Sequence, residues 1–242
     1  KWSESSDISG FIKDLYQCKK FESWGIDEGE LLKFITEMKP KSYAELTSAV
    51  YCFYGLKKKS DSFRYWGDKN SLWIESLPVI RELYPDVKVI HLVRDGRDVA
   101  CSYRELMKRE IISEYAPDLP REISAIANKW NRDIQSVLEM MKELKEGNFY
   151  EIRYEDILNN SGEALSGLMA FLDLEYTEDM LKFHAIKKNP LAEPVGFLQW
   201  KEQLLQPING SNQKKYLKEL TSEEIAEFNE ISAEYLCQYN YL

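Results

Sequence analysis

An arginine and a serine, Arg94 and Ser102, are the residues whose types and spacing most clearly suggest a chemical task. A guanidinium presents a planar fork of N–H donors that matches the oxygens of a phosphate, and a nearby hydroxyl adds another polar group. If both side chains point at one place, this pair predicts a phosphate-binding site. The alternative is an ordinary connection between a strand and a helix, with its charged side chains in solvent.

The chain around this pair has the pattern of a buried parallel strand that turns sharply into a helix. An apolar run over residues 87–93 ends at residues 94–98, which read Arg-Asp-Gly-Arg-Asp, and helical spacing follows. Ligands of open α/β sheets bind at the carboxyl ends of the strands, and the free N–H groups of a helix N-terminus favour an anion. The predicted phosphate site therefore lies at this turn. Arg97 is expected to lie in solvent or in an ion pair within the helix.

The rest of the chain predicts helices and one further strand. Residues 149–154 alternate between apolar and polar side chains, as a half-buried strand does. Helical spacing of apolar side chains extends over residues 7–60, 71–83, 123–144, 161–172 and 222–236. We therefore predict one α/β domain over residues 1–242, with a mainly parallel sheet flanked by helices.

Composition excludes several classes of function. The net charge of −9 argues against nucleic acid as a partner, although a small anionic cofactor fits a local basic pocket. Two histidines and four scattered cysteines give no metal-ligand spacing, so we expect no metal site, reduced thiols and a cytoplasmic location. No apolar run approaches the roughly 18 residues that span a bilayer, so no membrane segment is expected.

Four segments of the chain, in this order, resemble motifs of the sulfotransferase family: residues 65–70, 91–102, 152–157 and 197–201. Members of this family move a sulfuryl group from 3′-phosphoadenosine 5′-phosphosulfate (PAPS) to an acceptor hydroxyl or amine. The chain is most similar to the bacterial and tyrosylprotein sulfotransferases, and the similarity extends over nearly its whole length. The resemblance implies a P-loop-like α/β fold, PAPS as co-substrate, the bisphosphate PAP as product, and no metal.

The resemblance also assigns cofactor-binding roles to individual residues. Arg94 and Ser102 match the pair that binds the 3′-phosphate, and Tyr154 matches the tyrosine that contacts the adenine. Trp200 and Lys201 match a short aromatic and basic segment that closes over the cofactor. A core position for Tyr154 is the alternative that its residue type allows.

Two further residues match catalytic positions of the family. Lys69 matches a lysine that stabilises the departing bridging oxygen, although Asn70 and Ser71 follow it where the family has a proline. Glu4 lies in a Ser-Glu-Ser segment that resembles the Pro-Glu-Ser segment of the general base. A solvated turn lysine and an exposed glutamate are the respective alternatives.

The sequence departs from the family in one respect. The glycine-rich strand, loop and helix that bind the 5′-phosphosulfate have no counterpart before Glu4. We therefore expect that an N-terminal strand-loop-helix is missing from this sequence.

The expected reaction is in-line displacement of the sulfuryl group. Two alternatives stay open, a P-loop kinase-like nucleotide enzyme and a catalytically inactive binding module of the same fold. Residues 104–122 and 185–218 are expected to line the acceptor pocket. Their mixed polarity suits a small molecule, a saccharide or a peptide, and the sequence leaves the oligomeric state open.

Overall fold

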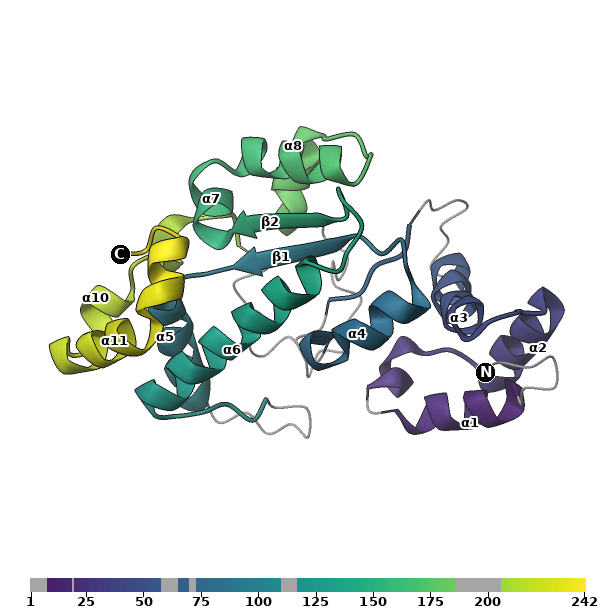
Figure 1. Ribbon diagram of the computed structural model, residues 1–242. Coiled ribbons are helices and arrows are strands. Elements are labelled where there is room, and N and C mark those ends of the chain that lie inside the picture. Colours follow the sequence, from purple (N-terminus) through teal and green to yellow (C-terminus); the bar gives the residue numbers. More distant parts are fainter. Residues whose placement is uncertain (1–7, 19, 58–64, 70–72, 110–116, 186–205) are drawn as a thin grey trace. The chain divides into compact units, whose positions relative to one another are not determined.

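A computed structural model describes the protein except for residues 1–7, 19, 58–64, 70–72, 110–116 and 186–205 (Figure 1). The chain divides into two compact units. The first comprises Lys1–Trp73 with Glu82–Tyr84, and the second comprises Ile74–Arg81 with Pro85–Leu242. Among the described residues, no helix is both long enough and apolar enough to cross a membrane.

The first unit is helical where it is described. Its elements are α1 (Ile8–Gln17), the 3₁₀ helix η1 (Phe21–Trp24), α2 (Glu28–Met38) and α3 (Tyr43–Lys57). Apolar side chains at helical spacing meet in one core, which contains Ile12, Phe21, Leu31, Ile35, Leu46, Ala49, Val50 and Phe53. The helix α4 (Trp73–Leu83) follows, and its residues are divided between the two units.

The second unit contains the predicted parallel strands, so the predicted α/β class is confirmed. Strand β1 (Val89–Val93) pairs in parallel with β2 (Phe149–Arg153), in a register that places Val89 opposite Phe149 and Val93 opposite Arg153. Each strand is slightly shorter than its apolar pattern predicts. On β1, Val93 is buried, whereas Ile90 and Leu92 on the other face are exposed.

Helices surround these two strands. They are α5 (Gly96–Met107), α6 (Ile123–Met141), α7 (Tyr154–Asn159), α8 (Ser161–Phe171), η2 (Glu178–Ala185), η4 (Gly210–Asn212), α10 (Tyr216–Glu219) and α11 (Ser222–Gln238). The apolar stripe of α6 packs with α5, α11 and the end of β1 in a second core, which includes Val93, Ala100, Ile126, Trp130, Ile134, Phe228 and Leu236. Thr221 and Glu224 form a reciprocal capping box that begins α11.

Residues 185–218, where no helical spacing of apolar side chains is predicted, contain short helices in their described part. Within residues 206–218, η4 lies entirely and α10 begins, although α10 ends one residue later at Glu219. Tertiary contacts with α5 fix this segment, as the site geometry shows. The local sequence pattern does not predict such contacts, because they join residues far apart in the sequence.

Candidate functional site

The turn from β1 into α5 brings Arg94 and Ser102 together, as their spacing predicts. Arg94 is the first residue after β1, and Ser102 lies within α5. Nη1 of Arg94 donates a hydrogen bond to Oγ of Ser102 at 2.9 Å. The hydroxyl in turn donates to the carbonyl of Asp98, one helical turn earlier, at 3.0 Å. The serine therefore accepts from the arginine and is itself fixed by the helix.

Two further residues hold the guanidinium of Arg94. The Tyr154 ring centroid lies 4.9 Å from Cζ, and Nη2 donates to the carbonyl oxygen of Asn212 at 2.8 Å. We call Arg94, Ser102, Tyr154 and Asn212 the Arg94 clasp. Within the described part of the chain, the buried Nε–H of Arg94 finds no hydrogen-bond acceptor. A buried donor without an acceptor is costly and uncommon, so this N–H is the donor of the cluster that still lacks a partner among the described residues.

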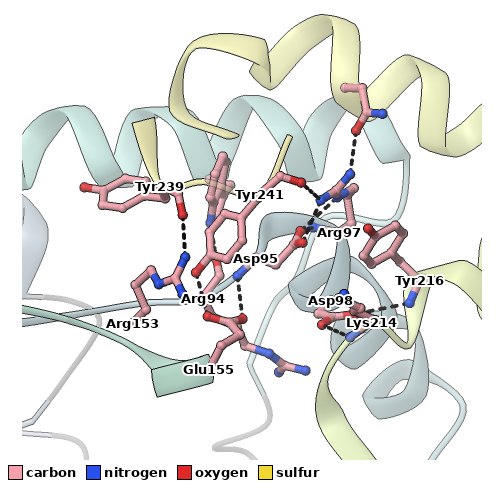
Figure 2. Close-up of polar contacts among 12 residues, drawn as sticks. Arg94, Asp95, Arg97, Asp98, Arg153, Glu155, Lys214, Tyr216, Tyr239 and Tyr241 are labelled. Carbon is pink, nitrogen blue, oxygen red and sulfur yellow. Dashed lines mark hydrogen bonds and ion pairs between the residues drawn. The ribbon is translucent and has the colours of Figure 1, made fainter. Parts of the chain in front are cut away.

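The N-terminus of α5 is occupied differently from the prediction. The carboxylate of Asp95 caps the helix by accepting from the amide of Arg97 at 2.9 Å. The amide of Asp95 itself donates to Glu155 at 3.2 Å (Figure 2). Carboxylates therefore already bind these two amides. The attraction of a phosphate to the N-terminus of α5 stays a prediction, and Arg94 is the charged donor beside it.

Arg97 is buried, so its predicted solvent position is wrong and its ion pair is confirmed. The residue is 3 % exposed, and its side chain pairs with Asp95, with Nη2–Oδ2 at 2.8 Å. It also donates to the carbonyl of Tyr241 at 2.7 Å and lies over the ring of Tyr216 at 4.1 Å (Figure 2). Burial alone would lower the pKa of Arg97, but the hydrogen bonds and charge of Asp95 outweigh it and raise the pKa. Arg97 therefore stays charged as a structural group.

Asp98 is a buried carboxylate that the sequence analysis does not single out. It is 1 % exposed, and its two oxygens accept from the backbone amides of Lys214, at 2.7 Å, and Tyr216, at 3.1 Å. Burial raises the pKa of Asp98, and the two amide hydrogen bonds oppose that shift. Its partners are backbone groups more than a hundred residues away, so no side-chain pattern could have indicated the contact.

The C-terminal residues Tyr239 and Tyr241 are bound to β2 and α7. Arg153 donates to the carbonyl of Tyr239 at 2.8 Å, and the Tyr239 hydroxyl donates to Glu151 at 2.8 Å. The hydroxyl of Tyr241 donates to Glu155 at 2.7 Å (Figure 2). Because Glu155 also binds the amide of Asp95, the C-terminal residues contribute to fixing the turn that carries Arg94.

The roles of the remaining predicted site residues are not tested by the structure. Lys69 is exposed, and its neighbour Asp68 accepts a hydrogen bond from the Tyr51 hydroxyl at 2.7 Å. Lys69 belongs to the first unit and Arg94 to the second. Glu4, Trp200 and Lys201 lie outside the described residues. Roles for these residues stay predictions.

A groove of about 530 Å³ lies beside β2 rather than at the Arg94 clasp. Its lining comes from β2, α7, α8 and the C-terminal residues: Tyr150, Glu151, Ile152, Arg153, Asp156, Asn160, Glu163, Ala164, Gly167, Gln238, Tyr239 and Asn240. Neither Arg94 nor Ser102 contributes to it. The clasp is therefore a packed cluster of donors that is separate from this groove.

The clasp can bind an anion through fixed, positively charged donors, and an aromatic ring lies beside them. That combination suits a phosphate carried on a planar ligand such as a nucleotide. Among the residues that the structure describes, no three His, Cys, Asp or Glu side chains are grouped to hold a metal ion.

Comparison with known proteins gives a family and several curated relatives. The model described as "Sulfotransferase family" matches residues 15–178. A protein-tyrosine sulfotransferase of Drosophila melanogaster is 20% identical over 210 residues, which cover 86% of this chain and 41% of that protein. Protein-tyrosine sulfotransferase 2 of Gallus gallus is 18% identical over 178 residues, covering 73% of this chain and 47% of that protein. The chain thus spans less than half the length of these curated relatives.

A solved structure has a similar fold. The sulfotransferase domain from the curacin biosynthetic pathway superposes with a TM-score of 0.55 at 18% sequence identity. The match covers 88% of this chain and 76% of that domain.

Proposed function

The chain belongs to the sulfotransferase family, and we propose that it uses PAPS to transfer a sulfuryl group to an acceptor hydroxyl or amine. The Arg94 clasp is the observation that carries this proposal. Its guanidinium is held by Ser102, Asn212 and Tyr154, and its buried Nε–H lacks an acceptor among the described residues. A phosphate oxygen supplies that acceptor and neutralises the charge.

In this proposal, the 3′-phosphate of PAPS binds Arg94 and Ser102, and the adenine lies against Tyr154. The ring of Tyr154 is beside the guanidinium, so phosphate and base would be recognised within one cluster. Trp200 and Lys201 would cover the cofactor, a role that rests on their resemblance to the family segment. The 3′-phosphate distinguishes PAPS from ATP, so the clasp provides specificity as well as affinity.

The proposed chemical step is an in-line displacement at sulfur. The acceptor oxygen or nitrogen forms a bond to sulfur while the bond between sulfur and the bridging phosphate oxygen breaks, and PAP leaves with that electron pair. Glu4 would take the acceptor's proton, and Lys69 would stabilise the negative charge on the departing oxygen. Catalysis of this kind depends on positioning and charge, as in phosphoryl transfer.

We propose a tyrosine hydroxyl of a peptide or protein as the acceptor. Two relatives that cover most of this chain are named as protein-tyrosine sulfotransferases, and this naming supports the choice. A phenol must lose its proton as it attacks sulfur, which is consistent with a carboxylate base in the proposed mechanism.

Calorimetric titration with PAP in the presence of EDTA tests the cofactor site. We expect metal-independent binding by the unsubstituted chain, weakened in Arg94→Ala by about 1.5–3 kcal/mol, the scale for a hydrogen bond to a charged group. Arg132→Ala removes the same charge from an exposed position on α6 and should bind PAP normally. Equal affinities in the two variants would contradict the proposed site.

Two further measurements separate the alternatives. Transfer of ³⁵S from labelled PAPS to a tyrosine-containing peptide tests the reaction itself. Binding of ATP only with Mg²⁺ would favour the kinase-like alternative. PAP binding without any transfer, to peptide, phenol or saccharide, would favour an inactive module.

A further inference from the structure

We propose that Asp98 is a positioning residue for the phosphate-binding arginine. Its carboxylate docks residues 212–216 against α5, so that the carbonyl of Asn212 fixes the guanidinium of Arg94. The proposed consequence for PAP affinity rests on the function proposed above. The docking itself rests on the contacts alone and is tested separately.

The first step is that both oxygens of the Asp98 carboxylate accept hydrogen bonds. One oxygen accepts from the amide of Lys214 at 2.7 Å, and the other accepts from the amide of Tyr216 at 3.1 Å (Figure 2). Asp98 is 1 % exposed, so these amides replace the water that a carboxylate otherwise requires. Removing either partner would leave an uncompensated buried group, which makes the docking specific.

The second step is the backbone conformation that the docking holds. Lys214 has φ of 53°, in the left-handed region that non-glycine residues seldom adopt. Surrounding contacts must stabilise such a residue, and its own amide is the one that binds Asp98. Only two residues earlier, the Asn212 carbonyl accepts from Nη2 of Arg94 at 2.8 Å. Asp98 therefore controls the direction of that carbonyl through a short, bent segment.

The third step is the attachment of the same segment by side chains. Nζ of Lys215 lies 2.8 Å from Oε2 of Glu105 on α5, and the ring of Tyr216 lies against Arg97. These contacts keep residues 214–216 near α5 even when Asp98 is changed. Loss of Asp98 should therefore alter the geometry at Arg94 before it releases the segment.

The predicted functional effect is selective for the 3′-phosphate. Without a fixed Asn212 carbonyl, Arg94 can rotate, and its donors no longer present one arrangement to the phosphate oxygens. We expect weaker binding of PAP and little change for adenosine 5′-monophosphate, which lacks the 3′-phosphate. Asp98→Asn retains one acceptor oxygen, so its affinity for PAP should lie between that of the unsubstituted chain and that of Asp98→Ala.

The experiment compares Asp98→Asn and Asp98→Ala with Ile134→Val, which removes one buried methyl group from α6 and changes no hydrogen bond of the segment. In the ligand-free chain, ¹⁵N spectra of arginine side chains report the guanidinium of Arg94, assigned by its absence in Arg94→Lys. We expect its slowly exchanging signals to weaken in Asp98→Asn and vanish in Asp98→Ala. PAP affinity should fall in the same order, by about tenfold for alanine. Ile134→Val should change neither quantity.

The outcomes distinguish this inference from the proposed function. Unchanged Arg94 signals in both Asp98 variants would overturn the docking. Altered signals with unchanged PAP affinity would show that the docking does not position the ligand, which also overturns the inference. If the unsubstituted chain does not bind PAP, the proposed function fails, and the Arg94 spectra alone decide the docking. If Asp98→Ala does not fold, the nearly isosteric Asp98→Asn still provides both measurements.

Discussion

Oγ of Ser102 lies 2.9 Å from Nη1 of Arg94 and points its own proton at the carbonyl of Asp98. The serine thus holds the arginine in an orientation that the helix itself dictates. A hydroxyl in this position acts first as an acceptor that preorganises the guanidinium. Any bond to a phosphate comes in addition to that role.

Replacing Ser102 with alanine should weaken PAP binding by about 1 kcal/mol, because Nη1 of Arg94 loses its partner. The effect should be absent for adenosine 5′-monophosphate, which carries no 3′-phosphate. Titration calorimetry with both nucleotides measures the difference. Ser166→Ala, at an exposed position on α8, is the matched control. Equal losses for the two nucleotides would place Ser102 away from the 3′-phosphate.

Tyr154 is predicted to act through its ring rather than its hydroxyl. Its centroid lies 4.9 Å from Cζ of Arg94, a distance at which a cation and an aromatic face attract. Tyr154→Phe should therefore bind PAP normally, whereas Tyr154→Ala should bind it about 1 kcal/mol more weakly. A loss in the phenylalanine variant, measured by the same titration, would assign the contribution to the hydroxyl.

Gly96 should not tolerate even a methyl group. A Cβ built there would lie 2.5 Å from Cζ of Phe228 and 2.7 Å from Cδ2 of Trp130. Gly96→Ala should lower the free energy of unfolding by about 1–3 kcal/mol through overpacking. Gly67→Ala is the control, because no atom of the described residues is found within 4 Å of its Cβ position. Denaturant unfolding of both variants measures the contrast, and equal stabilities would mean that this core can expand.

The ion pair between Arg104 and Glu224 should make stability depend on pH. The hydrogen bonds of Arg104 lower the pKa of Glu224 from its ordinary value of 4.5. A lowered pKa means that the ionised carboxylate stabilises the fold above pH 4.5, and that this contribution disappears as the pH falls through the lowered pKa.

Glu224→Gln should therefore be less stable than the unsubstituted chain at neutral pH, by up to about 1 kcal/mol. The two unfolding curves should converge in acid. Glu227→Gln, one turn further along α11 and exposed, should be as stable as the unsubstituted chain across the pH range. If the difference in unfolding free energy between Glu224→Gln and the unsubstituted chain does not change with pH, the effect comes from the helix cap instead of the charge.

The hydroxyl of Tyr241 should stabilise the turn after β1. It donates to Glu155, whose other oxygen accepts from the amide of Asp95. Tyr241→Phe should lower the free energy of unfolding by about 1 kcal/mol. In a double-mutant cycle with Glu155→Gln, the two losses should be less than additive because the residues share one hydrogen bond. Strict additivity would show that they act independently.

The sequence predicted the structure best where the pattern of apolar residues lies within a single helix or strand. The apolar run before Arg94, the apolar stripe of α6 and the alternation over 149–154 each predict an element that the structure contains. The eight-residue spacing also predicts that Arg94 and Ser102 meet, because a strand followed directly by a helix leaves little freedom between them.

Contacts between segments far apart in the sequence could not be predicted from the sequence. The amides of Lys214 and Tyr216 bind Asp98, and the carbonyl of Asn212 binds Arg94. Every residue except proline has such a backbone amide and carbonyl, so composition and periodicity contain no signal for them. Arg97 shows the same limit, because its burial depends on the carbonyl of Tyr241, 144 residues away.

The parallel pairing of β1 with β2 sets the order in which this unit can fold. The paired residues Val89 and Phe149 are separated by an intervening helical stretch, so the pairing requires closure of a long loop and cannot nucleate locally. Asn212, which binds Arg94, lies further still along the chain. During synthesis on a ribosome, the strand and helix that carry Arg94 emerge well before the segment that completes the clasp. Ligand affinity should therefore be among the last properties that a growing chain acquires.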